Sequence, residues 1–200
     1  MNRRAVILLH GRGGSAEDIL QLREEFGVPD VEWHAPEAPG NSWYPYSFLA
    51  PIAQNEPWLT SALGQVGKAV EQVAASGIPR ERIVLAGFSQ GACLATEFVA
   101  RNPARYGGLI AFTGGLIGPA GTAFEYAGSL EGTPAFLGAG DPDPHVPWSR
   151  VEESARVLSG MGAAVVLRRY PGMSHTIGRE EIEEGRKIIV PENAKLIGHR

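Results

Sequence analysis

The segment Gly87-Phe88-Ser89-Gln90-Gly91 is the strongest chemical signal in the sequence. The apolar run Ile83–Ala86 precedes it, and the stretch Ala92–Ala100, which favours a helix, follows it. A sharp turn from strand to helix lifts a serine hydroxyl above a sheet, and glycines two residues before and after the serine avoid collisions in that turn. The start of the helix also offers partial positive charge to a developing oxyanion. The pattern predicts a nucleophilic Ser89; the alternative is a chance match in a glycine-rich chain.

A serine nucleophile needs a base and an orienting acid, and at such a turn the chain order is serine, acid, histidine. His175 follows the last predicted strand and precedes the last predicted helix, which fits that order. The other four histidines fit less well, because they precede the serine, lie in the loop of candidate acids or stand next to the C-terminus: His10, His34, His145 and His199. His175 is therefore the predicted base.

Two aspartates compete for the role of the acid. Asp141 and Asp143 both lie in the loop Gly138–Pro147, directly after a predicted strand. Each stands next to a proline, and aspartates of this kind are common in turns, so either could be purely structural. Turn chemistry alone leaves both candidates open.

A glycine-rich turn, Gly11-Arg12-Gly13-Gly14, follows the first predicted strand. The backbone N–H of Arg12, together with that of Gln90, could form an oxyanion hole for the reaction at Ser89. The alternative is an ordinary turn between a strand and a helix. The turn is not a phosphate-binding loop, because no Gly-Lys-Ser/Thr follows it.

Apolar runs alternate with amphipathic stretches along the chain. Strands are expected at Ala5–Leu9, Val31–His34, Ile83–Ala86, Leu109–Phe112, Ala135–Leu137 and Ala164–Leu167. Apolar residues at helical spacing predict helices over 63–73, 151–158 and 19–26, the last capped by Ser15, and a final helix over 180–187 that ends before Pro191. This order predicts an α/β fold, with a mostly parallel sheet of about six strands and helices on both faces. The carboxyl ends of the strands then meet at one edge, where sites form.

Two long segments, 36–57 and 114–132, resist assignment to a helix or strand. Long loops in a compact domain are usually functional, so both are expected at that edge as walls of a pocket. The candidates for its lining are Trp43, Tyr44, Tyr46, Phe48, Trp58, Leu116 and Ile117. Trp43 and Leu116 are the favoured pair. Ordinary packing of the loops against the domain is the alternative.

Composition narrows the class of protein. The chain has 200 residues, of which 44% are hydrophobic and 20% charged, which suits one globular domain over residues 1–200. The net charge of −4 without a long basic run gives no sign of nucleic-acid binding, and no apolar stretch is long enough to span a membrane. Cys93 is the one cysteine, so no intramolecular disulfide can form, and a cytoplasmic location is the default. Cys93 lies one helical turn after Ser89 and is read as a small buried hydrophobe.

Four motifs in one order carry a family resemblance: His10-Gly11 after the first strand, Gly87–Gly91, Gly140-x-x-Asp143-Pro-x-Val-Pro147 and Gly172-Met173-x-His175. Together they resemble the phospholipase/carboxylesterase family of small α/β-hydrolases, which includes acyl-protein thioesterases. The resemblance implies that Asp143 is the acid. It also implies an α/β-hydrolase fold without a large cap domain, no cofactor or metal, a carboxylic ester or acyl thioester as substrate, and a possible homodimer.

The resulting hypothesis is a serine carboxylesterase that hydrolyses small to medium carboxylic esters through an acyl-enzyme. One alternative is a thioesterase or lysophospholipase that acts on longer acyl chains. Another is a catalytically silent module that has the same fold and binds a small ligand. The presence of Ser89, Asp143 and His175 together argues against the silent module, which would need none of them.

Overall fold

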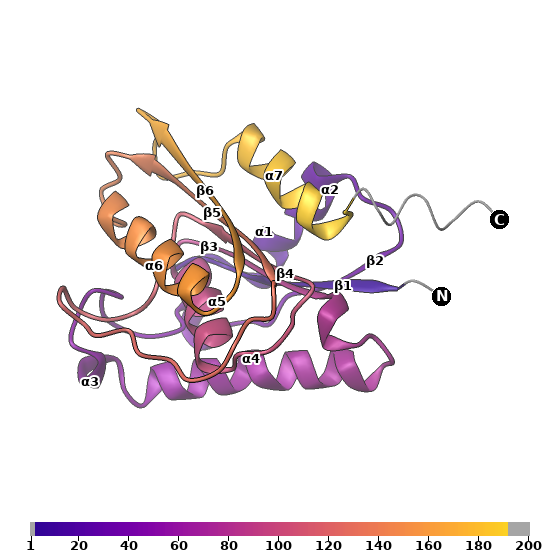
Figure 1. The fold of residues 1–200 in the computed structure, drawn as a ribbon, viewed down its shortest axis with the longest axis horizontal. Helices are drawn as coiled ribbons and strands as arrows, with labels where there is room; N and C mark the ends of the chain where they lie inside the picture. Colours follow the sequence, from indigo (N-terminus) through magenta and orange to yellow (C-terminus); the bar gives the residue numbers. More distant parts are fainter. Residues whose placement is uncertain (1–2, 192–200) are drawn as a thin grey trace.

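The computed structural model describes residues 3–191, which contain a six-stranded sheet with the strand order β2-β1-β3-β4-β5-β6 (Figure 1). Every neighbouring pair of strands is parallel. The strands are β1 (Arg4–Leu9), β2 (Val31–His34), β3 (Ile83–Phe88), β4 (Gly108–Phe112), β5 (Pro134–Asp141) and β6 (Ala164–Pro171). The predicted α/β fold and its number of strands are confirmed.

The central strands are buried on both faces, which explains their nearly continuous apolar runs. In β1 the side chains of Ala5, Ile7 and Leu9 belong to the core on one face of the sheet. Those of Val6 and Leu8 belong to the core on the other face. This alternation follows from the period of two residues along a strand.

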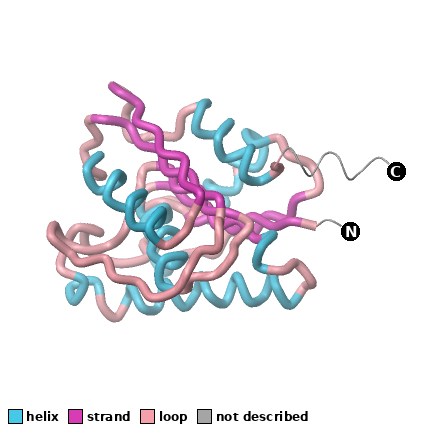
Figure 2. Tube along the Cα trace, in the orientation of Figure 1, coloured by secondary structure: helices cyan, strands magenta, loops and turns pink. Residues whose placement is uncertain are grey.

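Helices cover both faces of the sheet (Figure 2). One face carries α4 (Trp58–Ala75), α5 (Gln90–Arg101) and α6 (Trp148–Gly160). The other carries α1 (Ala16–Leu20), α2 (Leu22–Phe26) and α7 (Arg179–Ile189). In Figure 1, α2 and α7 lie above the sheet and α4 lies below it. The short elements are α3 (Ile52–Asn55) and the 3₁₀ turns η1 (Pro39–Asn41) and η2 (Arg80–Arg82).

The predicted helix over 19–26 is in fact two short helices. Ser15 caps the first as expected, and its hydroxyl accepts a hydrogen bond from the backbone N–H of Asp18. The Gln21 N–H then bonds the carbonyl of Asp18, and the Glu24 N–H bonds that of Gln21. These bonds span three residues instead of four, so the backbone tightens at Gln21 and the helix is interrupted there.

All strands run the same way, so their carboxyl ends share one edge of the sheet. β1 leads directly to the turn at Gly11, β3 to Ser89, β5 to Asp143 and β6 to His175. In the described part of the chain, no helix is long and apolar enough to cross a membrane.

Candidate active site

Ser89 stands at a strained turn between β3 and α5. Its backbone has φ 53° and ψ −116°, in a region that residues other than glycine rarely adopt. A Cβ atom on Gly87 would collide with the backbone of Gly91, and one on Gly91 would collide with the carbonyl of Leu9. The Ser89 N–H bonds the carbonyl of Phe112 at 3.0 Å, which fixes the turn to β4. The spacing of the two glycines is therefore what allows this turn to form.

The Ser89 hydroxyl meets the imidazole of His175. The distance from Ser89 Oγ to His175 Nε2 is 2.9 Å, although 86 residues separate them in sequence. The His175 side chain is 19% exposed, so solvent reaches one part of it. The rings of Phe88 and His145 pack against it, with centroid distances of 5.0 and 4.8 Å.

The second nitrogen of the His175 ring contacts Asp143. The distance from His175 Nδ1 to Asp143 Oδ2 is 2.7 Å, and the Asp143 side chain is fully buried. Burial opposes ionisation of this carboxyl, but N–H donors from His145 and Val146 and the His175 ring outweigh it and lower its pKa. An ionised Asp143 places the ring proton on Nδ1, so Nε2 is free to accept from Ser89.

The competing aspartate points elsewhere. The Asp141 carboxylate pairs with the guanidinium of Arg169 on β6. The Asp141 carbonyl accepts from the Gly172 N–H at 2.9 Å, which holds the loop that leads to His175 against the end of β5. Asp141 thus supports the loop, while Asp143 contacts the imidazole.

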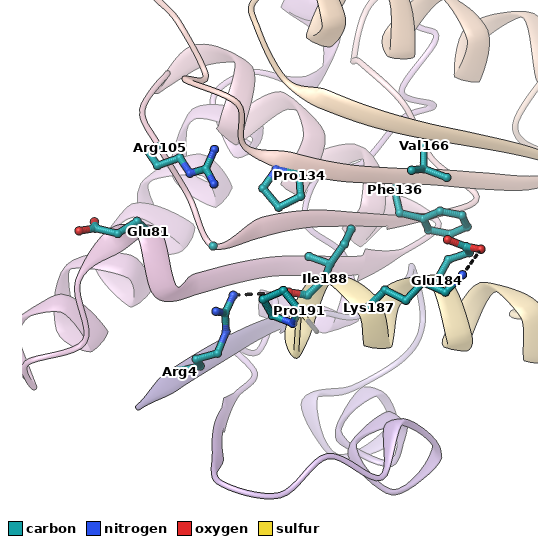
Figure 3. Close-up of a pocket in the computed structure, with 11 residues that line it drawn as sticks. Arg4, Glu81, Arg105, Pro134, Phe136, Val166, Glu184, Lys187, Ile188 and Pro191 are labelled. Carbon is teal, nitrogen blue, oxygen red and sulfur yellow. Dashed lines mark hydrogen bonds and ion pairs between the residues drawn. The ribbon is translucent and has the colours of Figure 1, made fainter. Parts of the chain in front are cut away.

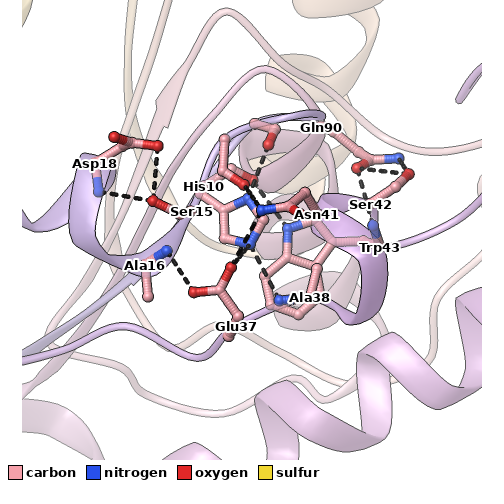
Figure 4. Close-up of polar contacts among 12 residues, drawn as sticks. His10, Ser15, Ala16, Asp18, Glu37, Ala38, Asn41, Ser42, Trp43 and Gln90 are labelled. Atoms are coloured by element: carbon pink, nitrogen blue, oxygen red, sulfur yellow. Dashed lines mark hydrogen bonds and ion pairs between the residues drawn. The ribbon is translucent and has the colours of Figure 1, made fainter.

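His10 supports the turn that follows β1. Its ring is buried and accepts a hydrogen bond from the Ala38 N–H at Nε2, at 3.1 Å (Figure 4). This assigns the ring proton to Nδ1, which lies 2.8 Å from the carbonyl of Gly11. Nearby, the Gly13 N–H bonds the Asn41 carbonyl at 2.7 Å, so the turn is also tied to η1. His10 therefore has a structural role in shaping the turn.

Trp43 is part of the same network, and the expectation that it lines the pocket is wrong. Its indole N–H donates to the carbonyl of His10 at 2.9 Å, and its ring packs on the His10 ring at 5.0 Å. The side chain is 2% exposed and faces the core. An indole buried in this way needs a partner for its N–H, and the carbonyl of His10 provides it.

The two residues predicted to supply the oxyanion hole both line one cavity with Ser89. The side chain of Arg12 donates to Ser42 Oγ at 3.0 Å and to the carbonyls of Pro45 and Tyr46, both at 2.8 Å. The side chain of Gln90 reaches the same loop from the first turn of α5. The side chains of both residues therefore hold the aromatic loop 42–48 in place. That their backbone N–H groups form an oxyanion hole is still a prediction.

The cavity above Ser89 has a volume of about 690 Å³. Its lining comprises Gly11, Arg12, Tyr44, Pro45, Tyr46, Ser47, Phe48, Phe88, Ser89, Gln90, Cys93, His145, Val146 and His175. The first long loop thus forms a wall through residues 44–48. Three lining residues were not predicted: Phe88, His145 and Val146. Phe88 directly precedes Ser89, and Val146 follows Asp143 by three residues. This closeness in sequence to the catalytic candidates was the available signal.

The second long loop does not reach this cavity, so the expectation for Leu116 is wrong. The Leu116 side chain is fully buried, and its N–H donates to Ser154 Oγ of α6 at 2.8 Å. The Arg150 guanidinium, also from α6, binds the carbonyls of Leu116 and Gly118 at 2.9 and 2.6 Å. These bonds hold the loop against α6, away from Ser89. Neither Trp58 nor Ile117 is in the lining.

A second cavity, of about 280 Å³, lies at the opposite edge of the sheet (Figure 3). It lies near the starts of β1 and β5, where Arg4 and Pro134 line it together with Ile188 of α7. Its charged groups are partly paired with one another: Lys187 bonds Glu184 at 2.7 Å. Among its described lining residues there is no serine, cysteine or histidine, the residue types from which the predicted catalytic groups come. Within residues 3–191, no group of three or more His, Cys, Asp or Glu could hold a metal ion.

Comparison with known proteins decides the family. The phospholipase/carboxylesterase family model matches residues 1–190. The chain belongs to this family. A crystal structure of a phospholipase/carboxylesterase from Dyadobacter fermentans is 51% identical, with a TM-score of 0.90, and the match covers 94% of this chain and 90% of that one.

Curated relatives agree with the family. A probable carboxylesterase of rice is 30% identical over 90% of this chain and 74% of that protein. An acyl-protein thioesterase 1 from Gibberella zeae is 29% identical over 94% of this chain and 92% of that protein. This member of the phospholipase/carboxylesterase family is thus a hydrolase with the α/β-hydrolase fold, as the four motifs predicted. Of the histidines weighed as a catalytic base, His199 lies outside the described residues.

Proposed function

We propose that this hydrolase cleaves small to medium carboxylic esters through an acyl-enzyme formed on Ser89. The observation that carries the proposal is the continuous chain of hydrogen bonds from Ser89 through His175 to Asp143, with lengths of 2.9 and 2.7 Å. Ser89, where this chain of hydrogen bonds begins, lines the cavity of about 690 Å³. This is the relation between nucleophile, base and orienting acid that acyl transfer requires.

In the first step His175 Nε2 takes the proton of Ser89 as the serine oxygen attacks the ester carbonyl. The carbonyl oxygen becomes an oxyanion, which the backbone N–H groups of Arg12 and Gln90 stabilise. The N-terminal end of α5 adds partial positive charge there. The protonated His175 then gives its proton to the departing alcohol, and the acyl group remains on Ser89.

In the second step a water molecule loses a proton to His175 and attacks the acyl carbonyl. The acid product leaves, and the proton returns from His175 to Ser89. Asp143 keeps the imidazole in the tautomer that accepts at Nε2 and stabilises its charged form. The donors from His145 and Val146 hold this carboxylate in place at 2.8 Å each.

A second candidate is an acyl thioesterase or lysophospholipase that acts on longer chains. The acyl-protein thioesterase among the relatives favours it. The two functions share the chemistry at Ser89 and differ in the acyl chain and leaving group.

The cytoplasmic location and the homodimer expected from the sequence are still predictions.

A panel of 4-nitrophenyl esters and acyl thioesters of graded chain length tests both candidates. We expect the highest kcat/KM for esters of short to medium chains, and a fall in kcat of roughly 10⁴-fold or more in Ser89→Ala. Near-native turnover in Ser89→Ala would contradict the mechanism. A preference for long thioesters would replace the first function by the second, and no turnover of any ester would favour a silent binding module.

A further inference from the structure

The guanidinium of Arg12 makes no ion pair within residues 3–191. Its Nη1 donates to Ser42 Oγ at 3.0 Å and to the carbonyl of Pro45 at 2.8 Å. Its Nη2 donates to the carbonyl of Tyr46 at 2.8 Å. Hydrogen bonds to these neutral oxygens hold the side chain in place, but they do not cancel its positive charge. An arginine fixed in this way can pair with an anion from outside the protein.

Two N–H donors of this guanidinium have no partner in the described part of the chain. A guanidinium has five N–H groups, and the bonds to Ser42, Pro45 and Tyr46 use three of them. The remaining two are the Nε–H and one Nη2–H, which lie on neighbouring nitrogens. A pair of donors of this kind matches the two oxygens of a carboxylate.

The guanidinium lies at the rim of the cavity above Ser89. Arg12 is exposed and lines the cavity together with Pro45 and Tyr46, whose carbonyls it binds. Its Cζ atom lies 6.0 Å from the ring centroid of Tyr44, which is another lining residue. The charge of Arg12 is therefore accessible to a bound substrate.

The charges around the cavity favour an anion at this rim. No aspartate or glutamate is among the described lining residues, and Arg12 is the one side chain among them with a permanent charge. Glu97 lies one turn after Cys93 on α5 and pairs with Arg101 at 2.6 Å. Burial raises the pKa of Cys93 to about 12, and the negative charge of Glu97 adds to this rise. An anionic group is thus disfavoured beside Cys93 and favoured beside Arg12.

The mechanism assigns directions to the parts of a bound ester. The carbonyl oxygen faces the proposed oxyanion hole, and the leaving oxygen faces His175, against which Phe88 and His145 pack. The acyl part is left with the wall formed by loop 42–48, on which the side chain of Arg12 rests. A group at the far end of the acyl part then meets the guanidinium.

We propose that the side chain of Arg12 determines specificity by binding a carboxylate at the far end of the acyl part of the substrate. The preferred substrates are then monoesters of dicarboxylic acids rather than esters of neutral acids. This inference rests on the proposed function, because it assumes an ester bound at Ser89.

Two pairs of esters test it: mono(4-nitrophenyl) adipate with 4-nitrophenyl adipamate, and mono(4-nitrophenyl) suberate with 4-nitrophenyl suberamate. In each pair a neutral carboxamide replaces the carboxylate with nearly the same shape, and the two acids differ in spacer length. At about pH 8 free imidazole is uncharged, so the comparison isolates the guanidinium. Arg12→Gln should lower the ratio of kcat/KM for the acid over the amide about 3- to 10-fold in at least one pair, because a partly exposed ionic hydrogen bond is lost. Intrinsic reactivity cancels, because each ester is compared between two enzymes.

Two control variants separate the charge from other effects. Ser42→Ala removes one acceptor of Arg12 and loosens loop 42–48 but keeps the charge, so it should change both esters of a pair alike. Arg179→Gln removes an equal charge from α7, where the side chain is 93% exposed and outside the cavity lining, and should leave the ratio unchanged.

The outcomes distinguish this inference from the proposed function. An equal change of both esters in Arg12→Gln, while both are still hydrolysed, would overturn the role of Arg12 and leave the esterase function intact. Absence of Ser89-dependent hydrolysis of all four esters would instead overturn the proposed function.

The wild-type enzyme gives a second readout that needs no variant. The chain has a net charge of −4, so long-range electrostatics alone would repel the anionic ester, and added salt would raise the ratio of acid over amide. Attraction to Arg12 has the opposite sign. The ratio should fall about 2- to 5-fold as NaCl increases from about 20 to about 500 mM. A ratio that stays constant or rises in both pairs would contradict the proposal.

Discussion

The side-chain carbonyl of Gln90 accepts a hydrogen bond from the backbone N–H of Trp43 at 3.0 Å. The Gln90 side-chain amide also donates to the carbonyl of Tyr44 at 2.8 Å. One residue therefore offers its backbone to the proposed oxyanion hole and holds the aromatic loop 42–48 with its side chain. The shape of the cavity and the site of the chemistry are linked through the first turn of α5.

Gln90→Ala should separate these two roles. The backbone N–H remains, but two buried hydrogen bonds to the loop are lost, at about 0.5–1.5 kcal/mol each. We expect a loss of about 1–3 kcal/mol in the free energy of unfolding and a fall in kcat/KM of about 10-fold, mainly through KM. Urea denaturation and steady-state kinetics measure both. A fall in kcat as large as that of Ser89→Ala would mean that the side chain takes part in the chemistry.

The two aspartates after β5 provide a matched pair of variants. Asp143→Asn removes the carboxylate that orients His175, so kcat should fall on the order of 10⁴-fold through the wrong tautomer. Asp141→Asn breaks an ion pair with Arg169, whose side chain is 54% exposed, and should cost less than 10-fold. Steady-state kinetics on one ester compares them. If Asp141→Asn were the crippled variant, the assignment of the acid would be wrong.

The central strands could be predicted because burial on both faces leaves apolar runs that the sequence displays directly. Val31–His34 has the predicted bounds, and the first and third strands differ from them by one or two residues. β5 and β6 continue to Asp141 and Pro171, beyond their predicted ends. The added residues are mostly glycine, alanine or charged, so the backbone pairing that extends these strands leaves no continuous apolar run in the sequence.

The site was predictable to different degrees. Ser89 and His175 followed from motif and chain order, whereas the choice of Asp143 depended on the family resemblance. Trp43 and Leu116 could not be placed, because an aromatic or aliphatic side chain in a loop does not reveal which way it points. The indole of Trp43 faces His10, and Arg150 holds the loop of Leu116 against α6.

Cys93 should be inert although it lines the cavity. Burial raises the pKa of its thiol to about 12, so almost none of it is the reactive thiolate near pH 8. We expect iodoacetamide to leave the folded enzyme active and Cys93 unalkylated, and to modify Cys93 after denaturation. Mass spectrometry of both samples measures this. Rapid alkylation of the folded enzyme with loss of activity would contradict the assignment.

Glu181 should make stability depend on pH. One oxygen of its buried carboxyl accepts from the Gly178 N–H at 2.8 Å, and the other has no partner among the described residues. Burial raises the pKa of Glu181 to about 7 from an ordinary value of 4.5, against the opposing effect of the Gly178 donor. The unfolded chain thus loses this proton at lower pH than the folded one. Stability should fall as pH rises from about 4.5 to 7, by up to roughly 3 kcal/mol, and then level off.

Glu181→Gln removes this titration and keeps an oxygen for the Gly178 N–H. The variant should be as stable as the wild type near pH 5 and more stable at pH 8, measured by urea denaturation at both values. Glu180→Gln, on the exposed side of the first turn of α7, is the control and should show no such difference. The same stability difference between Glu181→Gln and wild type at both pH values would refute the proposed titration.

Labelling with a fluorophosphonate tests the central claim most directly, because this probe phosphonylates an activated serine without the need for a natural substrate. The folded enzyme should carry one adduct, which peptide mapping by mass spectrometry places on Ser89, and ester hydrolysis should be lost in proportion. His175→Ala should label far more slowly. An enzyme that hydrolyses esters while Ser89 stays unmodified, or whose adduct lies on another residue, would contradict the account.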